Sequence, residues 1–147
     1  MTAARPSILA FCALLLHPAA GIAQELTVAD LKNPQTVTGD ELRQVLTGAK
    51  VTSRTRHGST RHWYNNSDGK FIASSDSRGY KGRATAYQTT GTGSWHVSPL
   101  DQYCVTIDWR AVDEKWCVFI LKADGKFYGS ARPNDPSARA VELGLQK

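Results

Sequence analysis

Residues 103–130, YCVTIDWRAVDEKWCVFILKADGKFYGS, contain the pattern that decides the fold. Apolar and polar side chains alternate over 103–109, which is the two-residue period of a strand with one buried face, and 116–122 is an apolar run in which every second side chain shares one face. The side chains expected on that face are Val105, Ile107, Trp109, Trp116, Val118 and Ile120. Asp124-Gly125 then supplies a residue pair that favours a tight hairpin turn. The stretch therefore predicts successive antiparallel strands.

Composition of the same kind extends back to Lys50, in short runs of β-branched and aromatic residues separated by Gly, Asn, Asp and Pro. A second Asp-Gly turn falls at 68–69. The expected strands are 50–56, 60–65, 70–75, 83–89, 93–97, 103–109, 116–122 and 126–131. Strands at this spacing predict a mainly β fold, either an antiparallel meander or a small up-and-down β-barrel, because closure removes exposed edges.

One short N-terminal helix is expected before these strands. Thr38-Gly39-Asp40-Glu41 has the pattern of a capping box, in which threonine and glutamate side chains satisfy free backbone N–H groups. Leu42, Val45 and Leu46 follow at helical spacing and share one face, and Gly48 supplies a left-handed stop. The pattern predicts a helix over 39–47, which is too short to be stable without packing.

The first residues have the organisation of an export signal. Arg5 precedes an apolar run over 8–16, and small residues lead to Ala23. A cleaved signal is favoured over a membrane anchor, because the run is far shorter than the roughly 20 residues that a span needs. The expected organisation is a signal peptide over 1–23, an extended lead-in over 24–37 and a single β-rich domain over 38–147, in the periplasm or secreted.

Cys104 and Cys117 are expected to form a disulfide, the usual state of an isolated cysteine pair in an oxidising compartment. The simplest hairpin conflicts with this bond. If 110–115 is the turn and Trp109 faces Trp116, Cys104 lies about 13 Å along the strand from the position opposite Cys117, whereas a disulfide needs Cα atoms within roughly 7 Å. The alternatives are a shifted register with a longer loop, a bulge or free thiols, and a shifted or bent hairpin is favoured.

Basic residues concentrate in one part of the expected domain. Residues 44–100 hold eight Lys or Arg against two Asp, whereas residues 101–147 hold seven residues of each sign. The segment 54–64 joins arginines and histidines to two aromatics, a combination that can pair with and stack on an anionic ligand. The alternative is a solvated hairpin face. The candidate ligand-binding residues are Arg54, Arg56, His57, Arg61, His62, Trp63, Arg78, Lys81 and Arg83.

Catalytic and metal sites have weaker signals. His57 and His62 face opposite sides of a continuous strand, which disfavours a metal site shared with His96. No G-x-S-x-G elbow is present, and the cysteines are expected to be oxidised. The carboxylates that we interpret as turn and solubility residues are those of Asp101, Asp108, Asp113 and Glu114. We therefore expect no catalytic residue, metal or cofactor, and no nucleic acid partner, since its motifs are absent from the sequence.

A set of short motifs resembles a family of small exported proteobacterial domains that is catalogued only as a domain of unknown function. The motifs are Gly93-Ser94-Trp95-His96-Val97, Cys104, Trp109, Trp116-Cys117 and the turn at Asp124-Gly125. The helix at 38–42 and its ending at 46–48 are similar to the N-terminal part of that family, so the resemblance covers about residues 38–128. It implies a compartment and a fold rather than an activity.

Two further likenesses concern the Gly-x-Trp segment at Gly93. Periplasmic protease inhibitors built as small barrels combine such a segment with a disulfide, although their order and spacing differ from those of this chain. Lipocalins carry the segment near their first strand, whereas here it falls late in the chain.

The sequence thus favours an exported, non-catalytic binding module that does not span a membrane once its signal is removed. Its partner would be an unidentified protein or an anionic ligand of the cell envelope. The alternatives are an inhibitor of a secreted protease or other hydrolase, and a small hydrolase.

Overall fold

The structure is a computed structural model that describes residues 25–56, 58–77, 87–110 and 112–147. The signal peptide expected over 1–23 lies outside these residues. The elements of the described chain are η1 (Val28–Asp30), β1 (Gln35–Val37), α1 (Gly39–Leu46), β2 (Lys50–Arg54), β3 (Thr60–Tyr64), β4 (Lys70–Ser77), β5 (Tyr87–Val97), β6 (Tyr103–Asp108), β7 (Asp113–Ala123), β8 (Lys126–Ser130) and β9 (Val141–Gln146).

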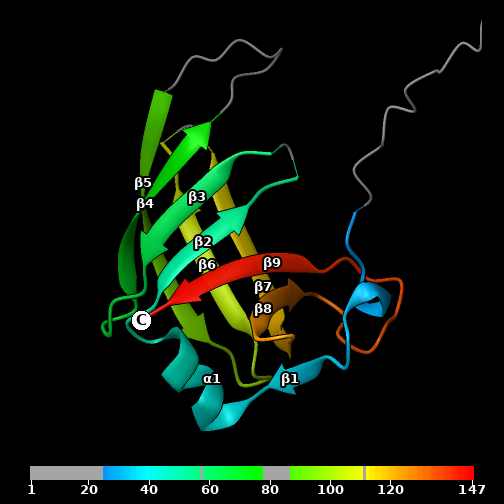
Figure 1. The fold of residues 1–147 in the computed structure, drawn as a ribbon. Helices are drawn as coiled ribbons and strands as arrows, with labels where there is room; N and C mark the ends of the chain where they lie inside the picture. Colours follow the sequence, from blue (N-terminus) through cyan, green and yellow to red (C-terminus); the bar gives the residue numbers. More distant parts are fainter. Residues whose placement is uncertain (1–24, 57, 78–86, 111) are drawn as a thin grey trace, which may run out of the picture.

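Strands β2 to β9 form a closed barrel (Figure 1). Each strand pairs antiparallel with the next one along the chain, and β9 returns to pair with β2. The described residues form nine strands, and β1 is the one that lies outside the barrel. It pairs with β7. The result is an eight-stranded up-and-down barrel, so the mainly β fold and the barrel expected from the alternation are confirmed.

Strand β9, which closes the barrel, was not among the expected strands. Leu143 of β9 lies opposite Ser53 of β2 and opposite Phe127 of β8, so this one strand joins the two ends of the meander. Its apolar residues Val141, Leu143 and Leu145 alternate with Glu142, Gly144 and Gln146, which is the period of a strand, but the run is short and glycine weakens a strand signal. Pairing with a strand on each side stabilises it.

The strands expected over 83–89 and 93–97 are wrong in one respect, because the described residues from 87 to 97 form a single strand, β5. Gly91 lies in the gap between the two expected strands, and Gly93 begins the second of them. Both lie within the paired stretch of β5, and each occupies a position where a side chain would collide with its neighbours. Glycine is present at these positions because of close packing, and the strand continues through them.

The hairpin of β6 and β7 resolves the conflict over the cysteines. Cys104 lies directly opposite Cys117, with Cα atoms 4.1 Å apart, and the two form the expected disulfide. Trp116 faces Val105 rather than Trp109, because β7 begins at Asp113 and the turn is shorter than the expected 110–115. The register is therefore shifted, as favoured above, but the turn is shorter rather than longer, so the longer loop and the expected pairing of the two tryptophans are wrong.

Helix α1 covers one end of the barrel (Figure 1). It spans Gly39–Leu46, close to the expected 39–47, and its Leu42 and Leu46 are fully buried. Gly48 has the expected positive φ of +70°. The expected capping box is wrong, because the Thr38 side chain makes no capping hydrogen bond. Gly39 enters the helix with a φ of +58°, so the first turn departs from the geometry that a capping box requires.

Two apolar clusters lie on the two sides of the barrel wall. The interior cluster includes Leu42, Leu46, Val51, Trp63, Phe71, Trp95, Tyr103, Val105, Ile107, Ile120 and Leu143, with Trp109, Trp116 and Val118 packed against it. The exterior cluster contains Val28, Leu31, Leu121, Ala123, Tyr128, Ala138 and Ala140. The expected inward face of β6 and β7 is therefore confirmed, and the lead-in residues cover part of the outer surface.

Candidate functional site

A cavity of about 370 Å³ opens in the barrel interior at the end away from helix α1. Arg54 ends β2 and Arg61 begins β3, so both lie near this opening, whereas α1 precedes the opposite end of β2. Further lining residues come from β7, β8, β9 and the segment that joins the last two strands. The helix thus closes one end of the barrel, and the other end gives access to the interior.

The inner part of the cavity is aromatic and aliphatic. Trp63, Trp116, Val118 and Leu143 line it. The ring centroids of Trp63 and Trp116 lie 6.3 Å apart with their planes inclined at 59°, and Trp63 is 4% exposed. An apolar group that entered the cavity would therefore exchange water for aromatic surface, which stabilises a bound ligand.

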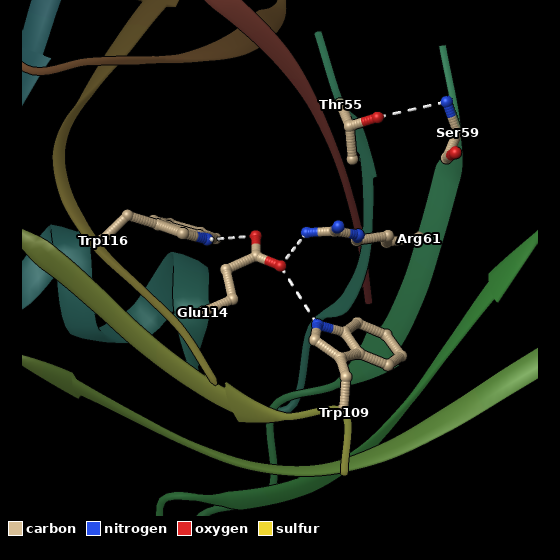
Figure 2. A network of polar contacts seen from close by, with 6 residues as sticks. All are labelled: Thr55, Ser59, Arg61, Trp109, Glu114 and Trp116. Carbon is tan, nitrogen blue, oxygen red and sulfur yellow. Dashed lines mark hydrogen bonds and ion pairs between the residues drawn. The ribbon is translucent and has the colours of Figure 1, made fainter. Parts of the chain in front are cut away.

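Glu114 lies at the centre of a polar network in the cavity wall (Figure 2). Its Oε2 accepts hydrogen bonds from Nη1 of Arg61 and from Nε1 of Trp109, the latter at 3.1 Å. Its Oε1 accepts a hydrogen bond from Nε1 of Trp116 at 3.0 Å. Three donors therefore hold this carboxylate, and one of them neutralises its charge.

Arg61 is placed by the same network. Its guanidinium carbon lies 5.2 Å from the centre of the Trp109 ring, a distance at which a cation and an aromatic face attract each other. Its Nε is buried and has no hydrogen-bond partner among the described residues. A buried donor without a partner is unfavourable by about 1–3 kcal/mol, a cost that the contacts of Arg61 with Glu114 and Trp109 offset.

The mouth of the cavity carries three more arginines, Arg54, Arg56 and Arg139. Oε1 of Glu25, from the start of the described chain, lies 2.5 Å from Nε of Arg139 and 3.8 Å from a guanidinium nitrogen of Arg56, so it forms an ion pair with each. These side chains are 36% to 72% exposed, so the ion pairs are accessible to water. Two mouth arginines therefore converge on one carboxylate.

The cavity has a positive excess. Its described lining contains four arginines and one glutamate, a net charge of +3. The same described lining contains no histidine or cysteine, and its one carboxylate, Glu114, already accepts hydrogen bonds from three donors. Within the described residues, no group of three or more His, Cys, Asp or Glu is placed to hold a metal ion.

No family model, curated protein or solved structure matches this chain. The resemblance to an exported proteobacterial family therefore stays a prediction. No helix in the described part of the chain is both long and apolar enough to cross a bilayer.

The structure brings four of the candidate ligand-binding residues together. Arg54, Arg56, Arg61 and Trp63 all line the cavity. His62 does not, because it is exposed on the outer face, where its Nδ1 forms a hydrogen bond of 3.1 Å with Oγ1 of Thr52. The remaining candidates, His57, Arg78, Lys81 and Arg83, lie outside the described residues.

Glu114, Trp116 and Arg139 were missed as site residues. The interpretation of Glu114 as a turn residue is wrong, because it lies in β7, two residues before Trp116 and on the same inner face. Extending the alternation of β7 by one step toward its N-terminus would have found it. Arg139 had no such signal, since it lies in the segment between β8 and β9, far along the chain from the other arginines.

Proposed function

We propose that this protein is an exported binding module whose barrel cavity holds a small anionic ligand with an aromatic or otherwise apolar body. The observation that carries the proposal is the cavity itself, in which arginines at the mouth surround an aromatic interior. The charged end of the ligand lies among the arginines, and its apolar part contacts Trp63 and Trp116.

The charge of the cavity favours an anion over a cation. A carboxylate among tryptophans is a common arrangement for binding ammonium groups, but Glu114 already accepts hydrogen bonds from Arg61 and two indoles. A cationic ligand would have to displace the chain's own guanidinium. An anionic ligand meets an excess of positive charge at the mouth, where three arginines lie near the single carboxylate of Glu25.

The size of the cavity favours a small molecule. Its volume of about 370 Å³ falls within the range of about 300–1,000 Å³ that is typical of small-molecule sites. The aromatic interior supplies binding free energy, and the arginines supply selectivity for charge, a division found in many such sites.

Export is supported by two independent features. The sequence begins with an apolar segment of the length and flanks of a signal peptide. Cys104 and Cys117 form a disulfide, which persists in oxidising compartments such as the periplasm or the cell exterior. The ligand would accordingly be encountered outside the cytoplasm.

The proposal is tested with a matched pair of fluorescent probes, anilinonaphthalene sulfonate and its uncharged parent N-phenylnaphthylamine. The purified mature protein should bind the sulfonate more tightly than the parent, and added salt should weaken the binding of the sulfonate. Replacing two of the three mouth arginines, Arg54→Ala with Arg56→Ala, should weaken binding of the sulfonate about tenfold, since two charged contacts together contribute on the order of 1.4 kcal/mol.

The control for net charge is the double variant Arg43→Ala with Lys50→Ala. Both residues are exposed and lie at the helix end of the barrel, away from the cavity. This variant loses the same two positive charges and should keep the affinity of the wild type. Equal weakening in the two double variants, or equal affinity for the two probes, would overturn the proposal.

A further inference from the structure

We infer that Arg56 and Arg139 form the anion subsite of the cavity, where a carboxylate or sulfonate of the ligand binds in the place now taken by Glu25. Glu25 is then a tethered competitor supplied by the N-terminal segment of the protein. The inference rests on the proposed function and adds to it the position of the anionic group and a means of regulating access.

The first argument is the contact itself. The Glu25 carboxylate forms ion pairs with Arg139, 2.5 Å from its Nε, and with Arg56, 3.8 Å from its Nη2, and both arginines line the cavity. A carboxylate held by two guanidinium groups is the arrangement by which proteins recognise carboxylate and related anions. The chain thus supplies, at the mouth, one example of the chemical group that the subsite would bind.

The second argument is that the backbone holds Glu25 in this place. Thr27 forms a β-bridge with Arg139, the N–H of Ala140 donates to the carbonyl of Leu26 at 2.8 Å, and the N–H of Val28 donates to the carbonyl of Ala138 at 2.8 Å. Val28 and Leu31 also pack into the exterior cluster. Glu25 is therefore delivered to the mouth by a segment that is fixed to the segment carrying Arg139.

The third argument concerns how strongly Glu25 binds the subsite in comparison with a ligand. A tethered group acts at an effective concentration in the millimolar range, so even a weak contact occupies the subsite when no ligand is present. Glu25 and Arg56 are about half and about three-quarters exposed, and ion pairs with this exposure are weak. A ligand that also contacts the aromatic interior has additional binding free energy and displaces the glutamate, so Glu25 raises the ligand concentration needed for occupancy without abolishing binding.

The test removes the charge of the competitor. In Glu25→Gln, which retains the size of the side chain, anilinonaphthalene sulfonate should bind about three- to tenfold more tightly than in the wild type, and N-phenylnaphthylamine should bind as before. The control is Glu142→Gln. Glu142 is exposed to nearly the same extent as Glu25, at 53% against 52%, and pairs with Lys126. The Glu142→Gln variant should have the same affinity for both probes as the wild type.

A second variant locates the effect. With Arg139→Gln, sulfonate binding should weaken, and adding Glu25→Gln should then produce a much smaller gain than it does in the wild type, because the competitor has lost its principal partner. Unchanged or weaker binding of the sulfonate in Glu25→Gln, or an equal gain in Glu142→Gln, would overturn the inference. Failure of the proposed function is distinguishable, since the wild type would then show no preference for the sulfonate and no dependence on the mouth arginines.

Discussion

Gly93 illustrates how a single residue sets the shape of the barrel interior. It lies opposite Phe71 in the pairing of β4 and β5, and a Cβ at this position would lie 2.2 and 2.3 Å from two carbons of the Phe71 ring. The ring instead crosses the glycine and stacks against Trp63, with centroids 5.5 Å apart. Because Trp63 lines the cavity, the absence of a side chain at 93 determines where the aromatic interior lies.

Gly93→Ala should therefore lower the free energy of unfolding by about 1–3 kcal/mol, the usual effect of overpacking in a core. The measurement is the urea midpoint of the variant against that of Ser94→Ala, a change at the exposed neighbouring position of the same strand. Combining Gly93→Ala with Phe71→Leu should destabilise the protein by less than the sum of the two single changes. Full additivity would show that the ring and the methyl group do not conflict.

At the level of the element, the hairpin of β6 and β7 places Glu114 and Trp116 in the cavity wall. A slip of one residue in its register would turn both side chains to the outer face. The disulfide between Cys104 and Cys117 joins directly opposed residues and opposes such a slip. It also closes a loop with a sequence separation of 13 residues, which restricts the unfolded chain.

Replacing both cysteines with serine should lower the free energy of unfolding by roughly 3 kcal/mol, the value expected for a loop of this length. Urea denaturation with and without a thiol reductant measures the effect. Reductant should destabilise the wild type to about the same extent and have no effect on the double variant. A wild-type midpoint that does not respond to full reduction would contradict this account.

At the level of the whole molecule, a buried polar network joins helix α1 to the barrel. Asn65 donates from Nδ2 to the carbonyl of Leu46 at 3.1 Å, and its Oδ1 accepts from Nε1 of Trp63 at 3.0 Å and from the Tyr103 hydroxyl at 2.9 Å. The helix, β3 and β6 are thus linked at the closed end. Burial raises the pKa of the Tyr103 hydroxyl far above its usual range, and hydrogen bonds from Trp63 and with Asn65 oppose this only in part.

This shift predicts a loss of stability in alkali. The unfolded chain ionises Tyr103 near pH 10, whereas the folded protein keeps the proton on this hydroxyl. The free energy of unfolding therefore keeps its full value below about pH 10 and falls above that pH by up to about 1.4 kcal/mol per pH unit. The free energy of unfolding, measured with urea from about pH 9 to about pH 11, should depend less steeply on pH in Tyr103→Phe than in the wild type. Tyr64→Phe, a change at an exposed tyrosine, should retain the wild-type dependence. Identical curves for Tyr103→Phe and the wild type would refute the prediction.

The features that were predictable from the sequence are those that arise between near neighbours. The alternation of β6 and β7 indicated their inner face, and the turn at Asp124-Gly125 has the expected positive φ at both residues, 48° and 73°. The arginines of 54–64 were recognised as a candidate site because they lie close together in the sequence. The pairing within the β6 and β7 hairpin was predicted wrongly, because the turn was expected over 110–115 whereas the strands already pair at Asp108 and Asp113.

The amino-acid sequence by itself determined a mainly β fold with a short helix, the inward face of its central strands and the paired cysteines, because periodicity, turn chemistry and cysteine spacing act over short distances along the chain. Only the tertiary structure decided that β9 closes the barrel, that Arg61 meets Glu114 across 53 residues, and that Glu25 meets Arg139 at the mouth. These contacts form when the strands curve into a cylinder, and their partners are chosen by the closure of the whole sheet rather than by any local pattern.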